Sequence, residues 1–134
     1  MRHPFNLIGL LLLALLMPSL AFAEAGCPIS SESPKTLGSS VSTYTLSPAD
    51  ACGFLNFTDT SGTTITMPNA AVTLPAGFKV WIKAQSSGTV ILGTPTTSTI
   101  DGVAGPVSIT TGTGVEVRSD GVNYFTSGLG IKHP

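Results

Sequence analysis

Apolar and polar side chains alternate over residues 77–84 more cleanly than anywhere else in the chain. A repeat of two residues is typical of a β-strand with one buried face. The apolar side of this stretch carries Phe78, Val80 and Ile82, and the opposite side carries Lys79, Trp81 and Lys83. We therefore predict a central strand here, with the three apolar side chains in the core.

The rest of the pattern consists of shorter β-branched runs separated by Gly, Pro, Asn, Asp and Ser. These runs predict strands at residues 41–46, 54–58, 63–67, 71–74, 89–92, 98–100, 107–110, 115–118 and 122–126. Asp120-Gly121, between the last two, predicts a tight hairpin because this dipeptide accepts positive φ angles. Strands spaced at about ten residues indicate an all-β fold, either a small β-sandwich or a compact barrel of short antiparallel strands.

Helical periodicity is absent from the sequence after residue 23. A single helical turn is expected at residues 47–53. There Ser47 can cap the turn, Pro48 suits the first helical position, and Gly53 can end it.

The first 23 residues have the layout of a secretory signal peptide. Arg2 lies near the start, an apolar run covers residues 7–17, Pro18 breaks it, and Ala21 and Ala23 complete an Ala-x-Ala motif. We expect an N-terminal signal helix that is cleaved after Ala23. The protein would then be exported, to the periplasm, to the medium or to a virion surface.

This leader has two alternative fates. An uncleaved membrane anchor is the alternative, because residues 5–22 are just long enough to span a bilayer. Lipidation at Cys27 is disfavoured, because Glu24 occupies the position three before the cysteine, where a leucine-like residue is needed. Contact with a membrane is therefore expected only through the N-terminal segment.

Removal of the leader leaves 111 residues with five basic and seven acidic side chains, a net charge of −2 with histidine neutral. Nucleic-acid binding needs clustered Lys and Arg, so this balance predicts no nucleic-acid partner. A chain of this length buries about two thirds of its unfolded surface, enough for one modest core.

Cys27 and Cys52 both lie in the exported part. An even number of cysteines in an oxidising compartment predicts a disulfide bond between them. With 24 residues between the two cysteines, the bond would stabilise the fold by roughly 3 kcal/mol through chain entropy. A zinc site is a poor alternative, because two thiols alone do not make one.

Four regions follow from these observations. Residues 1–23 form the leader, and residues 24–40 form an extended arm rich in Ser, Pro and Gly that the disulfide would tether. Residues 41–129 form the β domain, and residues 130–134 are expected to be a flexible C-terminus.

No catalytic, cofactor-binding or metal-binding set is predicted. A serine nucleophile normally needs a histidine base, and His133 near the end of the chain is the only histidine after the leader. The acidic residues are scattered singly, several of them beside Gly or Ser, which is typical of turns. A secreted hydrolase stays a third hypothesis, because two carboxylates distant in sequence can meet in space.

The polar side of residues 77–84 is the most suggestive surface feature. Trp81 lies between Lys79 and Lys83, and an aromatic ring between two cations can stack on a sugar or meet an anionic polymer. The alternative is that a partner subunit or a second sheet covers this side.

Several short motifs resemble, in their order, a small β domain found in tail-fibre, tail and other surface proteins of bacteriophages. The motifs are YTLSPADA (44–51), Gly53, ITMP (65–68), LPAGF (74–78), SGTV (87–90), TIDG (99–102) and SDGVNY (119–124). The resemblance covers about residues 41–129. It implies a non-enzymatic virion module, often oligomeric, that decorates a particle or contacts a host surface, and it assigns no binding residue.

Two features depart from that family. The turn at Asp50-Ala51-Cys52-Gly53 is one residue longer than the family's Asp-Ala-Gly, and the added residue is the cysteine. A leader peptide is also unexpected, since tailed-phage fibres assemble in the cytoplasm. A virion that matures at a membrane would reconcile the two, as would a bacterial secreted protein that carries the domain.

Two main hypotheses result. The first is an exported virion or surface structural and attachment module, with self-association or other virion and surface proteins as partners. The second is a bacterial secreted or periplasmic carbohydrate-binding or adhesin domain, with a host-surface glycan as ligand.

Overall fold

The structure is a computed structural model that describes residues 34–86, 88–93 and 97–133. The predicted leader, its cleavage point after Ala23, Cys27 and most of the predicted arm lie outside the described residues. Within the described part of the chain, no helix is both long enough and apolar enough to cross a membrane.

The described residues form short strands and one helical turn. In chain order these elements are β1 (Lys35–Leu37), β2 (Thr43–Thr45), η1 (Pro48–Asp50), β3 (Phe54–Phe57), β4 (Thr63–Thr66), β5 (Lys79–Ala84), β6 (Val90–Gly93), β7 (Val107–Ile109), β8 (Gly114–Ser119), β9 (Tyr124–Gly128) and β10 (Ile131–Lys132).

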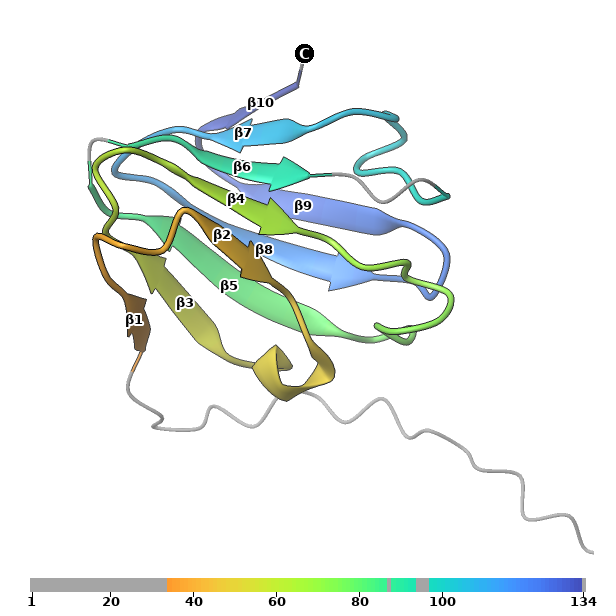
Figure 1. The fold of residues 1–134 in the computed structure, drawn as a ribbon. Helices are drawn as coiled ribbons and strands as arrows, with labels where there is room; N and C mark the ends of the chain where they lie inside the picture. Colours follow the sequence, from red (N-terminus) through yellow and green to blue (C-terminus); the bar gives the residue numbers. More distant parts are fainter. Residues whose placement is uncertain (1–33, 87, 94–96, 134) are drawn as a thin grey trace, which may run out of the picture.

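The strands make two five-stranded sheets that pack face to face (Figure 1). Sheet A has the order β1-β3-β5-β8-β9, and sheet B has the order β10-β7-β6-β4-β2. β5 is the middle strand of sheet A, as the alternation over residues 77–84 predicts.

The first six strands alternate between the two sheets, so the chain winds around the core as a short coil (Figure 1). Each strand then pairs in parallel with the strand two places later, in the pairs β1–β3, β2–β4, β3–β5 and β4–β6. After β6 the chain reverses, and the remaining pairs are antiparallel.

The prediction of an all-β, sandwich-like fold is confirmed, but the prediction of antiparallel strands throughout is wrong. The sheets are mixed, and they do not close into a barrel. The physical reason is that a turn after a short strand can lead either to a hairpin partner or across to the other sheet. Spacing along the chain is similar in both cases, so it does not fix the direction of pairing.

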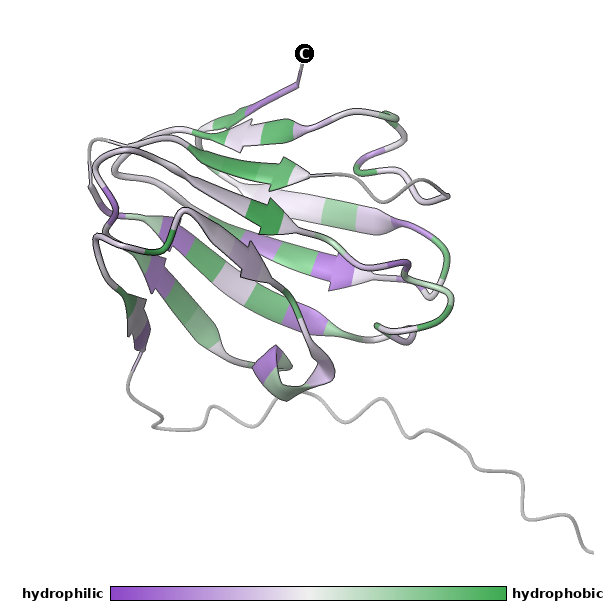
Figure 2. Ribbon diagram, viewed as in Figure 1, coloured by the Kyte–Doolittle hydropathy of each residue, from purple (hydrophilic) through white to green (hydrophobic). Residues whose placement is uncertain are grey.

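The core lies between the sheets, where the inward side chains of both meet. Phe78 is 5% exposed, and Val80 and Ile82 are fully buried, as predicted. Apolar and polar residues alternate along β5 (Figure 2), and on β3 the inward side chains of Leu55 and Phe57 are buried. Tyr124 is also buried, and its hydroxyl donates a hydrogen bond to the carbonyl oxygen of Pro68 at 2.5 Å.

Two predicted strands are wrong. Residues 70–73 form a turn, in which the Asn69 carbonyl oxygen accepts from Thr73 N–H and the Asn69 side chain accepts from Ala71 N–H. These local hydrogen bonds take the place of the backbone hydrogen bonds that a strand would make to its neighbour. Only Ile100 of residues 98–100 pairs, as an isolated bridge to Val103 and Tyr124.

Two short strands were not predicted. β1 lies at the end of the predicted arm and pairs with β3, and β10 lies in the predicted flexible C-terminus and pairs with β7. Each is too short to show a period in the sequence.

The predicted helical turn and the predicted hairpin are both present, but the helical turn ends at Asp50 with Ala51 as its C-cap residue rather than at Gly53. η1 is a single turn with Ser47 as its N-cap residue and Pro48 in its first position. The β8–β9 hairpin contains Gly121 at φ +90°, and the carboxylate of Asp120 accepts from the N–H groups of Val122 and Asn123.

Candidate binding surface

The predicted polar stripe of β5 lies on the outer face of sheet A. Lys79, Trp81 and Lys83 alternate with the buried side chains of the strand. Trp81 is 46% exposed, and the two lysines are half-buried. Among the described residues no element covers this stripe.

The neighbouring strands add two more aromatic rings to the same face. Phe54 on β3 is the direct partner of Trp81 across the sheet and is 36% exposed. On β9, Phe125 is opposite Arg118 and is 46% exposed. Soluble proteins seldom expose large apolar groups together unless the surface has a partner, so three rings on one face indicate a binding surface.

One end of this face is hollowed. The hollow measures about 380 Å³ and is lined by residues 77–79, by residues 118–120 and by Phe125. It lies where β5, β8 and β9 are neighbours, because Lys79 pairs with Arg118 and Arg118 pairs with Phe125. A cation pair and an aromatic ring therefore stand in one row across the sheet, in the wall of the hollow.

The outer face of sheet A is positively charged. Its cations are Lys79, Lys83 and Arg118, and its only carboxylate on the strands is that of Glu116, which gives a charge of +2. This contrasts with the net charge of −1 of the whole chain.

Glu116 and Arg118 form an ion pair on this face. The Nε–H of Arg118 donates to the Glu116 carboxylate, whose side chain is 8% exposed against 60% for that of Arg118. Glu116 thereby fixes one edge of the guanidinium. The remaining Arg118 N–H groups and the ammonium groups of Lys79 and Lys83 have no hydrogen-bond partner within the described residues.

Asp120 lines the hollow from the hairpin. Its carboxylate accepts hydrogen bonds from the backbone N–H groups of Asn123 and Val122, and these lower its pKa. Asp120 is thus ionised at neutral pH and is held by its own turn.

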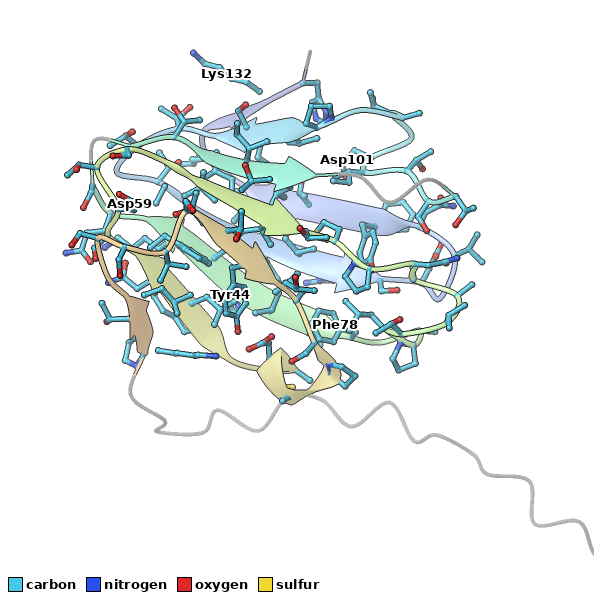
Figure 3. All side chains as sticks on the ribbon, in the orientation of Figure 1. Tyr44, Asp59, Phe78, Asp101 and Lys132 are labelled. Atoms are coloured by element: carbon cyan, nitrogen blue, oxygen red, sulfur yellow. The ribbon has the colours of Figure 1, made fainter. Side chains whose placement is uncertain are left out.

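The His, Cys, Asp and Glu side chains of the described residues are the candidates for a metal site. No three of the His, Cys, Asp and Glu side chains there lie close enough to hold a metal ion. Asp59 is a turn residue whose carboxylate accepts from Ser61 N–H (Figure 3). Cys52 lies in an exposed turn at φ +61°, and its predicted partner Cys27 lies outside the described residues.

A cluster at the edge of the molecule was not predicted. The Lys35 ammonium donates to the Tyr44 hydroxyl at 2.7 Å, and that hydroxyl donates to the Asp50 carboxylate at 2.6 Å (Figure 3). Asp50 also accepts from the backbone N–H of Ser47 at 2.9 Å. Burial, more than any other cause, raises the pKa of Tyr44. The cluster ties β1, β2 and η1 together, and its groups satisfy one another.

Sequence reasoning found the β5 stripe but missed its neighbours. The register of β3, β8 and β9 against β5 brings four more residues to this surface: Phe54, Phe125, Glu116 and Arg118. One signal was visible in the sequence: each of these residues alternates with core residues of its own strand. The alternation shows which side of the sheet each residue faces, but it does not show which residue lies next to it on the neighbouring strand.

Comparison with known proteins finds no matching family model, no matching curated protein and no matching solved structure.

Proposed function

We propose that this protein is an exported, non-enzymatic attachment module of a virion or cell surface, and that the outer face of sheet A is its docking face. The observation that carries the proposal is the group of exposed rings on that face, with Trp81 at its centre between Lys79 and Lys83. Exposed aromatic residues ringed by polar ones mark interaction sites.

The resemblance of residues 41–129 to bacteriophage surface domains supports the virion setting, and the predicted leader peptide supports export. Self-association and other virion or surface proteins are the partners this setting implies. The bacterial alternative is a secreted carbohydrate-binding or adhesin domain, and the observation that favours it is the hollow beside Phe125. Both proposals use the outer face of sheet A as the docking face. They differ in whether that face belongs to a virion module or to a bacterial secreted or periplasmic domain.

The docking face is tested by substitution of Trp81. We expect fluorescently labelled Trp81→Ala protein to lose most of its binding to a panel of bacterial cells measured by flow cytometry. Val72→Ala is the matched control, because Val72 is 82% exposed in the turn at residues 70–73, outside the strands of both sheets. Circular dichroism melts would verify that both variants fold. Equal binding by Trp81→Ala and wild type would remove this face from the proposal.

The setting is tested by proteomics of purified particles. Presence of the chain in virions favours the virion module, and its presence only in culture medium or periplasm favours the bacterial adhesin.

A further inference from the structure

We infer that the ligand of the outer face of sheet A is an acidic polysaccharide, with a carboxylate group bound by Lys79 and Arg118 in the hollow beside Phe125. The inference rests on the proposed attachment function and names the chemistry of the ligand. It follows from four observations on charge, unused donors, shape and acceptors.

Lys79 and Arg118 are directly opposite each other on β5 and β8. Opposed side chains in an antiparallel pair have Cβ atoms about 5 Å apart, and like charges there repel. Glu116 compensates for part of this repulsion through its ion pair with Arg118. An anion between the two cations would compensate for the rest.

The unused donors of this pair suit a carboxylate. Glu116 occupies the Nε–H of Arg118 and so holds the guanidinium in place. The terminal N–H groups remain free of partners within the described residues, and so does the Lys79 ammonium. A guanidinium offers two parallel N–H groups that match the two oxygens of a carboxylate.

The shape and the aromatic rings suit a sugar. A hollow of about 380 Å³ lies at the small end of ligand sites, which run from about 300 Å³ upward. It is large enough for one saccharide unit but open to the rest of the face. Phe125 offers an aromatic wall inside the hollow, and Trp81 lies two residues from Lys79 along β5. A chain of sugar rings that leaves the hollow along β5 would therefore meet Trp81.

The acceptors on this face favour a polyol over a nucleic acid. Asp120 lines the hollow and Glu116 lies beside it on β8. Carboxylates accept hydrogen bonds from sugar hydroxyls, and the phosphodiester backbone of DNA carries no such hydroxyl donors. Single-stranded nucleic acid also binds to rings and cations, so it is the competing outcome of the test.

The test is a binding titration of the mature protein with polygalacturonate oligosaccharides, which carry a carboxylate on each unit. We expect Arg118→Gln and Lys79→Met each to weaken binding by about tenfold or more, the effect of losing a hydrogen bond to a charged group. Lys132→Met is the matched control, because Lys132 lies on β10 of sheet B, far from Phe78 in the hollow (Figure 3). Binding should weaken as salt rises, since salt screens exposed charges.

Two further arms use neutral dextran and a thymidine oligonucleotide. We expect neither to bind with a dependence on Arg118. Oligonucleotide binding that is lost in Arg118→Gln, or equal affinity for dextran and polygalacturonate, would overturn the inference. If polygalacturonate does not bind while binding to cells still depends on Trp81, the inference fails and the attachment function stands. If polygalacturonate does not bind and binding to cells does not depend on Trp81, both the inference and the attachment function are rejected. Lys79→Met, on a different strand from Arg118, keeps the test decisive if Arg118→Gln does not fold.

Discussion

The position of one glycine shows how tightly the turns of this protein pack. A Cβ atom added at Gly88 would lie 2.3 Å from the carbonyl oxygen of Asp59 and 2.5 Å from the nitrogen of Gly62. Backbone atoms cannot move aside as the end of a side chain can. At Gly38, by contrast, an added Cβ would meet nothing within 4 Å.

Gly88→Ala should therefore destabilise the protein by about 1–3 kcal/mol or more, the range for overpacking. Gly38→Ala is the matched control, and it should be neutral or stabilise by about 0.4–1 kcal/mol through the unfolded chain. Urea unfolding of the two variants measures the difference. Equal effects would mean that the turn at residues 59–62 yields to the extra methyl group.

Tyr124 makes the free energy of unfolding of the protein depend on pH in the alkaline range. Burial raises the pKa of its hydroxyl to about 12, above the value of 10.0 that is usual for tyrosine. The folded state therefore holds this proton more tightly than the unfolded state does. Its contribution to stability is complete below about pH 10, and it is lost as the pH rises toward about 12.

Tyr124→Phe should remove this part of the pH dependence. We expect the variant to be less stable at neutral pH, because Pro68 loses a hydrogen-bond donor. Its free energy of unfolding should also fall less steeply than that of the wild type between about pH 10 and 12. Denaturant unfolding at a series of alkaline pH values measures both slopes. Tyr44, whose pKa is also raised, stays in both proteins and supplies the remaining slope. Parallel curves would contradict the assignment to Tyr124.

At the scale of elements, an aspartate blocks an open sheet edge. β9 is the last strand of sheet A, and a free edge can pair with another chain. The Asp101 carboxylate accepts from Thr126 N–H at 2.7 Å and also from the Thr126 hydroxyl. Asp101 N–H in turn donates to the carbonyl oxygen of Tyr124. The edge is thus occupied by a loop and by a carboxylate.

Asp101→Ala should lower the free energy of unfolding by about 1.5–3 kcal/mol, because a hydrogen bond to a charged group is lost. The unpaired edge should also increase self-association, which light scattering detects. Asp101→Asn is the matched control: it keeps an acceptor oxygen and tolerates the observed φ of +52°. An alanine variant as stable and as monomeric as the asparagine variant would show that the carboxylate does not protect the edge.

The elements also show what the sequence could predict. β5 was predictable because Phe78, Val80 and Ile82 all face one core. The turn at residues 70–73 was mistaken for a strand, because its apolar residues resemble one and its hydrogen bonds to Asn69 are visible only in space. The residues that line the hollow could likewise be predicted only in part from the sequence. Lys79 was identified from its own strand, whereas Arg118 and Phe125 joined it only through strand register.

At the scale of the whole molecule, the coil of parallel strands pairs residues that lie far apart in the sequence. Leu55 pairs with Lys35, and Trp81 pairs with Phe54. Each turn of the coil buries a new layer against the previous one, so the first turn, with β1 and β2, has a neighbour on one side only. The predicted disulfide would act at this end of the coil.

Cys52 follows η1, and its backbone N–H donates to the Lys79 carbonyl oxygen at 2.7 Å. A bond from Cys52 to Cys27 would hold the N-terminal arm against the first turn and against β5, the strand of the proposed docking face. Closing this loop should stabilise the folded state by roughly 3 kcal/mol, mainly by restricting the unfolded chain. Reductant should therefore lower the denaturation midpoint of the wild-type protein, and it should leave the midpoint of Cys52→Ser unchanged. Mass spectrometry under non-reducing conditions should show two hydrogens fewer than the dithiol, and free thiols at both cysteines would contradict the tether.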